Sequence, residues 1–204
     1  MQVPTCSREL LQGLGALAGK YDCHVQTHAA ESVDQVSLVR SQYPDLRRDI
    51  VILRTFGLLT PKTVLAHCTH LHDSEAAEMA AAGASIASCP CSNMLFARSI
   101  LPVNRFRNLG VDVGLGTDVA GGWSASMVDS MRMAALASRI DGFRPPSDRT
   151  ADPHVDVAAA PEKDEERFDY RPAPPPFWTS LGAALSCSAA ALSSRGCCFS
   201  CSSS

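Results

Sequence analysis

Three side chains that suit metal-assisted hydrolysis stand at the ends of apolar runs. His28 and His67 each close a short apolar run, and Asp118 follows directly after another. Neutral imidazole and carboxylate are ligands that suit zinc, and zinc lowers the pKa of a bound water towards 7. The three positions therefore predict a metal-hydrolase centre, provided that the fold brings them together.

His24 and His28 stand four residues apart, which is the spacing of a zinc pair on a helix. The segment is predicted to be a strand, however, and in a strand four residues span about 13 Å at roughly 3.3 Å per residue. Both rings then cannot reach one ion at about 2 Å. His28 is the better candidate, because parallel barrels build their sites at the carboxyl ends of strands. The alternative for a single strand histidine is a core residue.

Glu31 lies three residues beyond His28, where a carboxylate can lean over whatever His28 binds. It suits a proton shuttle, and the alternative is a first-turn helix acid next to Ser32. His70 and His72 fall in the loop after His67 and are predicted to be surface residues.

Two glycines lead up to Asp118. Side-chain alternation along a strand puts Gly114, Gly116 and Asp118 on one face, so that a ligand can approach the carboxylate closely. The alternative is a turn-forming aspartate in a strand-to-helix loop.

Strands and helices are predicted to alternate over about residues 7–140. Capping residues ahead of helical periodicity place helix starts at Ser7, Ser32, Asp73 and Ser124. The first helix is expected to bury Leu10, Leu14 and Leu17. The predicted strands are residues 23–28, 63–67, 84–88 and 111–117. Such alternation favours an α/β fold with parallel strands, either doubly wound or part of a (β/α)8 barrel.

The composition is that of a soluble globular protein. Of 204 residues 46% are hydrophobic, and no stretch approaches the roughly 20 apolar residues of a membrane-spanning helix. The net charge of -3 comes from interspersed charges, so no basic face favours nucleic acid. The nine cysteines are odd in number and no secretion signal is visible, so reduced thiols are expected. We therefore expect a cytoplasmic protein with a small-molecule substrate and neither a membrane nor a nucleic-acid partner.

The character of the sequence changes at about Gly142. Proline-rich, acidic and serine-rich stretches follow, and these bury too little apolar surface to become ordered. We predict a partial barrel domain in residues 1–141 and a low-complexity, disordered tail in residues 142–204. Our hypothesis is that the tail arose from intron read-through or a frame error.

Four strings resemble strands five to eight of the amidohydrolase superfamily: residues 26–31, 64–68, 84–93 and 114–118. The similarity covers about residues 3–140 and implies a partial (β/α)8 TIM barrel. Within the superfamily, residues 116–124, with Ser126, Met127 and Asp129, look like the guanine deaminase branch rather than the adenosine or chlorohydrolase branches.

The resemblance implies a role for each candidate residue. His28 and Asp118 would bind one Zn²⁺ and contact a purine substrate, and Asp118 would also take a proton from the attacking water. His67 would hold the hydroxide, Glu31 would carry protons to the purine ring nitrogen, and Asn93 would contact the substrate. Attack at the amino-bearing carbon of guanine would release ammonia and leave xanthine, and the resemblance also suggests a homodimer.

The sequence departs from the superfamily pattern in three ways. The His-x-His pair of the first barrel strand is absent before Gln26, and the Arg-Phe pair that grips the purine would fall just before Met1. Cys91 stands where these enzymes usually carry asparagine. With two protein ligands zinc should bind weakly, and four strands of eight leave two unpaired edges, which favours aggregation.

Several hypotheses remain open. The chain is part of an enzyme whose coding sequence starts further upstream, or a non-enzymatic remnant, alone or paired with another chain. Alternatively it belongs to a related amidohydrolase acting on another aminopurine or triazine. A cytidine-deaminase type of zinc site is rejected, because Met94 stands where its Pro-Cys-x-x-Cys motif needs the second cysteine.

Overall fold

The computed structural model describes residues 2–143 of the chain. The last described helix continues to Phe143, two residues beyond the predicted end of the ordered domain. The remainder of the predicted tail, residues 144–204, lies outside the described residues.

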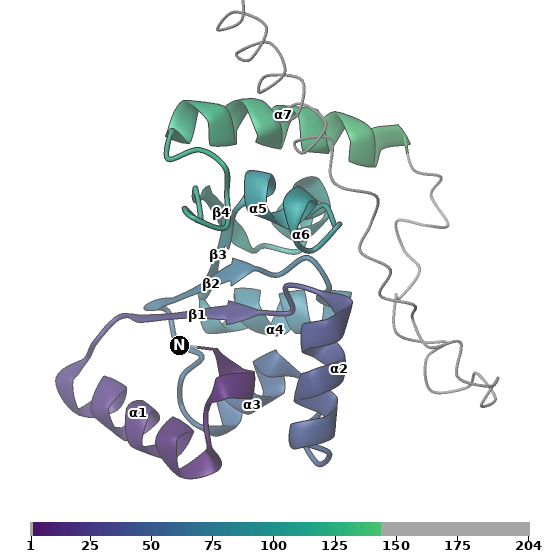
Figure 1. Ribbon diagram of the computed structural model, residues 1–204. Coiled ribbons are helices and arrows are strands. Elements are labelled where there is room, and N and C mark those ends of the chain that lie inside the picture. The colour runs from purple at the N-terminus through teal and green to yellow at the C-terminus, as the bar shows by residue number, and fades with distance from the viewer. Residues whose placement is uncertain (1, 144–204) are drawn as a thin grey trace, which may run out of the picture. The chain divides into compact units, whose positions relative to one another are not determined.

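Four parallel strands form one sheet, in the order of the chain (Figure 1). They are β1 (Val25–Ala29), β2 (Thr63–His67), β3 (Ser85–Ser88) and β4 (Asp112–Leu115). Each strand pairs with the next one along the sequence, so every connection is a crossover that contains helix. The predicted α/β architecture with parallel strands is confirmed. That these are strands five to eight of a barrel stays a prediction.

Helices fill the crossovers and both ends of the described part. They are η1 (Val3–Thr5), α1 (Arg8–Tyr21), α2 (Val33–Gln42), α3 (Asp49–Thr55), α4 (Asp73–Ala82), α5 (Pro90–Leu95), α6 (Val103–Asn108) and α7 (Met127–Phe143). In Figure 1, α2, α3 and α4 flank β1 and β2, whereas α5, α6 and α7 lie beside β3 and β4. No helix within residues 2–143 is long and apolar enough to cross a membrane.

The two faces of the sheet differ in burial. Thr27, Leu65 and Ile86 are laterally paired residues and are between 0 and 1% exposed, so they form the centre of the core. The next row alternates to the other face, where Gln26 and Asp112 at the two edges are exposed. The helices therefore cover one face of the sheet, and on the other face the positions at the two edges stay exposed.

The first helix packs on a different face from the predicted one. Of the three predicted residues Leu14 packs against the core, whereas Leu10 is 48% and Leu17 is 52% exposed. Leu11 and Gly15 are buried instead. A side chain at position 15 would lie 1.8 Å from the carbonyl oxygen of Phe56, so only glycine permits this approach. Close backbone contact at one glycine has decided the orientation of the helix.

The segment that forms α3 was not predicted as a helix. Asp49–Thr55 contains isoleucine and valine, residues that favour strands when taken alone. In the structure it forms a short helix that buries Ile50, Ile52 and Leu53. Burial of three large side chains outweighs the small intrinsic preference.

Candidate metal centre

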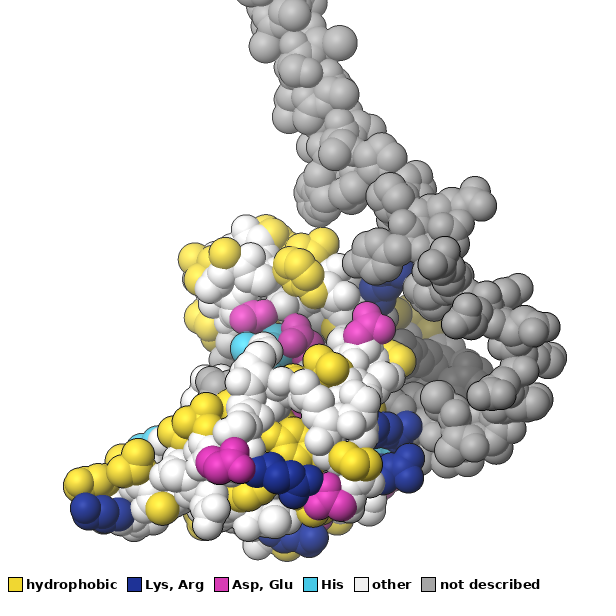
Figure 2. Space-filling model, turned by 60° about the horizontal axis from the view of Figure 1, so that its bottom comes forward, with side chains coloured by type: hydrophobic (Ala, Val, Ile, Leu, Met, Phe, Trp, Pro, Cys, Tyr) yellow, Lys and Arg dark blue, Asp and Glu magenta, His cyan; other side chains and the backbone are white. Residues whose placement is uncertain are grey.

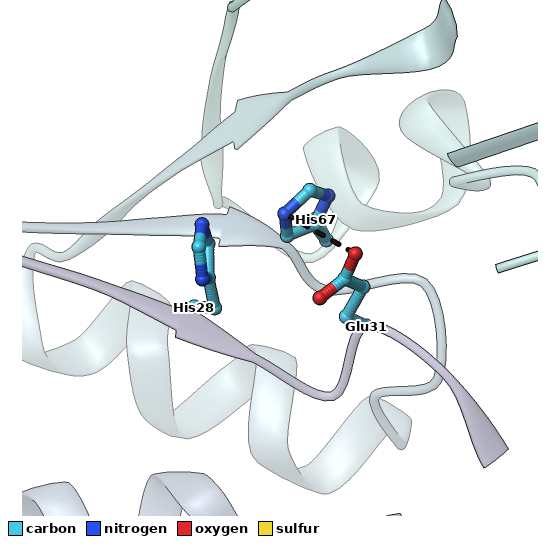
Figure 3. A group of neighbouring side chains, drawn as sticks. All are labelled: His28, Glu31 and His67. Carbon is cyan, nitrogen blue, oxygen red and sulfur yellow. Dashed lines mark ion pairs between the residues drawn. The ribbon is translucent and has the colours of Figure 1, made fainter. Parts of the chain in front are cut away.

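The carboxyl ends of β1 and β2 bring three ligand-type side chains together. His28 lies one residue before the end of β1, His67 is the last residue of β2, and Glu31 follows in the loop after β1. Figure 3 shows both rings and the Glu31 carboxylate directed into one space. One ligand atom of each lies within 4.8 Å of the others, and this is the one such group of three within residues 2–143.

Hydrogen bonds from two other segments anchor the loop that carries Glu31. Ala30 has a left-handed backbone conformation, with a φ of 44°, which costs a non-glycine residue roughly 1–2 kcal/mol. Its N–H donates to Oδ2 of Asp49 at 3.0 Å, and the Thr69 hydroxyl donates to the Glu31 carbonyl at 2.7 Å. The two bonds offset the backbone cost and fix Glu31 relative to His28.

Asp49, the first residue of α3, is a buried carboxyl group behind this loop. It is 3% exposed, and its Oδ1 has no hydrogen-bond partner among the described residues. Burial raises the pKa of Asp49 to about 7; the N–H of Ala30 opposes this shift and the charge of Glu75 adds to it. A small cavity of about 10 Å³ adjoins the carboxyl group and is also lined by His70 and His72.

His67 is the buried member of the site and has a buried partner. The ring is 1% exposed, and its Nδ1 lies 2.8 Å from Oδ1 of Asn93 in α5, which is itself 2% exposed. Nε2 faces the other way, 3.7 Å from Oε1 of Glu31 and 3.9 Å from Oδ2 of Asp118. One nitrogen is therefore engaged by the protein interior and the other is presented to the two carboxylates.

The donor set fits a divalent transition metal ion. Because the Asn93 oxygen only accepts, Nδ1 of His67 carries the proton, and in a neutral ring the lone pair then lies on Nε2. That lone pair faces two carboxylate oxygens, and a cation among them satisfies all three acceptors. Imidazole nitrogen and carboxylate oxygen are the usual zinc ligands in hydrolases. Burial lowers the pKa of His28, helped by His67 and opposed by Glu31 and Asp118, which favours the neutral, ligating ring.

Asp118 reaches the site from a loop. β4 ends at Leu115, so the alternation predicted through Gly116 to Asp118 does not continue, and Asp118 has a φ of 48°. A Cβ at Gly121 would lie 2.6 Å from its Oδ2, so the missing side chain leaves room for the carboxylate. On the face shown in Figure 2, acidic and histidine side chains lie side by side at the surface.

The structure places the other candidates away from the group of three. His24 is exposed and lies outside β1, as expected for a residue that does not share the site. His70 and His72, predicted at the surface, are half-buried, and both line the small cavity that Asp49 also lines. Asn93 contacts His67, and the substrate contact expected for it stays a prediction. Sequence reasoning missed Asp49, because α3 was not predicted.

The chain matches the amidohydrolase family model over residues 2–149. Human guanine deaminase is 40% identical over 136 residues, which are 67% of this chain and 30% of the human protein. A probable guanine deaminase of Schizosaccharomyces pombe is 38% identical over 136 residues, 67% of this chain and 26% of the yeast protein.

Solved structures agree with this match. A crystal structure of guanine deaminase from C. acetobutylicum, with guanine in its active site, superposes with a TM-score of 0.64 and 33% identity. The superposition covers 66% of this chain and 32% of that one. The chain thus spans less than a third of the length of each of these three proteins. With a match over most of its length and ligand-type residues at the carboxyl ends of parallel strands, the chain belongs to the amidohydrolase family.

Proposed function

We propose that this chain contributes part of the active site of a zinc-dependent guanine deaminase, which hydrolyses guanine to xanthine and ammonia. The observation that carries the proposal is the convergence of His28, Glu31 and His67, with Oδ2 of Asp118 3.9 Å from Nε2 of His67. The chain is also 31–40% identical to guanine deaminases from several organisms. Because the chain spans under a third of these relatives, the complete activity belongs to a protein that also contains the remaining strands.

Zinc is the metal that we propose for the site, with His28 and Asp118 as its ligands. Glu31 and His67 belong with His28 to one group of ligand-type side chains, so both would stand beside an ion held there. When bound, zinc supplies Lewis acidity that lowers the pKa of an adjacent water. The remaining protein ligands belong to the part of the relatives that this chain does not span.

The chain's own residues move the protons. Asp118 takes a proton from the attacking water, and the buried imidazole of His67 holds the oxygen nucleophile. Glu31, 25% exposed by its side chain, stands at the mouth and delivers a proton to the purine ring nitrogen. Water adds at the amino-bearing carbon, and the C–N bond breaks as ammonia leaves. Glu31 and Asp118 are both directed at the same side of His67, so one site serves both transfers.

The first experiment is to sequence the transcript upstream of the codon for Met1 and to express the reading frame that it encodes. The encoded protein should release ammonia from guanine and not from adenine or cytosine. A chelator should abolish the activity and added Zn²⁺ should restore it. Preference for another aminopurine or a triazine would replace the proposed substrate.

Ligand variants test the residue assignment. His28→Ala and Asp118→Ala should lower kcat by more than the roughly 10- to 100-fold that loss of an outer partner of a metal ligand costs. His24→Ala is the matched control, because His24 is an exposed histidine four residues away. Equal effects of His24→Ala and His28→Ala would refute the assignment.

A non-catalytic fragment is the second candidate. One observation favours it: the described residues contain a single group of three ligand-type side chains, fewer protein ligands than the resemblance implies. A transcript whose translation begins at Met1, together with no deaminase activity of the purified chain, would establish this alternative.

We also propose a cytoplasmic location and a homodimer. The five cysteines in the described part are free thiols, which suits a reducing compartment. Leu10, Leu17 and Tyr21 on α1 are each about half exposed or more, and such a surface is suited to a second copy. Fractionation of the cell and light scattering of the purified protein test the two proposals, and no membrane or nucleic-acid partner is expected.

A further inference from the structure

Both histidines of the metal centre are held at Nδ1 by a side-chain carboxamide. Nδ1 of His67 contacts Oδ1 of Asn93, and Nδ1 of His28 contacts the amide group of Gln2. Gln2 and Asn93 come from distant parts of the sequence, Gln2 directly before η1 and Asn93 in α5. The two ring centroids are 4.8 Å apart, and each ring offers one nitrogen to the group of three ligand-type side chains.

We propose that Asn93 is a positioning residue that selects, in His67, the imidazole tautomer with its lone pair on Nε2, and that Gln2 is a positioning residue that holds the His28 ring at Nδ1. This inference rests on the proposed metal site and explains how the site is prepared before a metal arrives. A neutral imidazole carries its single N–H on either nitrogen, and the partner of one nitrogen decides which. An oxygen at Nδ1 keeps the proton there, and Nε2 is left as the ligand or acceptor.

The two carboxamides present different atoms to the two rings. Asn93 is 2% exposed and presents its oxygen to His67, so this ring is fixed with its lone pair on Nε2. Gln2 presents its nitrogen to His28, which makes Nδ1 the acceptor and puts the proton on Nε2. A half-turn of the amide exchanges its oxygen and nitrogen with almost no change in shape. Metal binding at His28 therefore requires the Gln2 amide to turn.

Neutral partners suit this site better than carboxylates. Glu31 and Asp118 already bring two negative charges to within 4 Å of His67. A further carboxylate at Nδ1 would favour the doubly protonated ring, which cannot act as a ligand. A carboxamide orients the ring without adding charge.

The experiment reads the tautomers directly in the full chain without metal. Long-range ¹H–¹⁵N correlation spectra of histidine-labelled protein at about pH 8, above the ordinary imidazole pKa of about 6.5, report which nitrogen carries the proton. His67 should carry it on Nδ1. Asn93→Leu should move it to Nε2, the preference of the free imidazole, and the exposed Asn104→Leu on α6 is the matched control.

A second measurement adds metal. Titration with Zn²⁺ alone should move the His28 proton from Nε2 to Nδ1, and Gln2→Leu should weaken Zn²⁺ binding about 10- to 100-fold, with the exposed Gln42→Leu as control. An unchanged His67 tautomer in a folded Asn93→Leu protein would overturn the assignment of Asn93. Equal Zn²⁺ affinity of Gln2→Leu and the original chain would overturn that of Gln2. If no Zn²⁺ binds at all, the proposed metal site fails, and the Asn93 spectra still decide the positioning role.

Discussion

The two edges of the sheet differ in how completely this chain packs them. At β1 the chain covers its own edge, because Gln2 pairs with His28 and Val3 is fully buried. At β4 the residues alternate between exposed and half-buried, and Asp118 extends from a loop. Ligands near the β1 edge are therefore held by several segments, whereas the carboxylate beyond β4 depends on one loop. Metal sites need such rigid support on every side.

Shortening a core side chain should give the largest difference in stability between the two sides of the sheet. Leu65→Ala in β2 removes a fully buried side chain and should cost about 3–5 kcal/mol of unfolding free energy. Leu115→Ala in β4 is the matched change at a half-buried position and should cost roughly 1 kcal/mol. Urea unfolding followed by circular dichroism measures both. Equal losses would mean that the β4 edge is packed as tightly as β2.

The buried Asp49 should make the stability of the β1 side depend on pH. Its folded pKa of about 7 lies above the ordinary value of 3.8, so between these pH values the folded state holds a proton that the unfolded state has lost. The stabilisation that this bound proton gives to the folded state is fully present below about pH 4 and is lost as the pH rises to 7. The loss amounts to at most about 4 kcal/mol, at about 1.4 kcal/mol per pKa unit.

The matched variant for Asp49 is Asp49→Asn, which keeps an acceptor for the Ala30 N–H and does not titrate. The difference in unfolding free energy between the two proteins should change steadily from pH 4 to pH 7, measured by urea titration at several pH values. A difference that is constant over this range would show that Asp49 keeps its ordinary pKa.

A smaller change should loosen only the β4 side. Gly121→Ala places a Cβ 2.6 Å from Oδ2 of Asp118 and should displace this carboxylate, lowering Zn²⁺ affinity by about tenfold, or 1.4 kcal/mol. Gly13→Ala in α1 has nothing within 4 Å of the added carbon and should leave Zn²⁺ affinity unchanged. Calorimetric titration compares them. An unaltered affinity in Gly121→Ala would exclude Asp118 as a ligand in this chain.

The smallest effect is expected at the surface. Lys62 pairs with Asp22 ahead of β1 and β2, and the Asp22 side chain is 83% exposed. Exposed ion pairs gain little, because water screens them and both side chains lose freedom. Lys62→Ala should therefore leave the midpoint of urea unfolding unchanged within error. A clear shift would place this pair among the interactions that hold the β1 edge.

The presence and order of the strands could be predicted from the sequence, and so could the end of β2 at His67. Two other ends differ, because β1 ends at Ala29 and β4 already ends at Leu115. Short apolar runs that lead up to His28 and His67 are recognisable as strands from local residue types alone. The alternation of strands and helices indicated parallel pairing. The side of a helix that packs was harder to predict. Leu10 and Leu11 are equally apolar, and only the approach of Gly15 to Phe56 decides between them.

The site likewise has features that the sequence predicts and features that only packing decides. The sequence by itself determined which side chains carry chemistry and that they follow strands, because residue type and periodicity are local properties. Only the tertiary structure brought together the pairs that support the site. Gln2 meets His28 across 26 residues of chain, Asp49 meets Ala30 across 19, and Asn93 meets His67 across 26. Such contacts depend on how α3 and α5 pack against the sheet. Packing is the sum of many small contacts between distant residues, and no single stretch of sequence contains it.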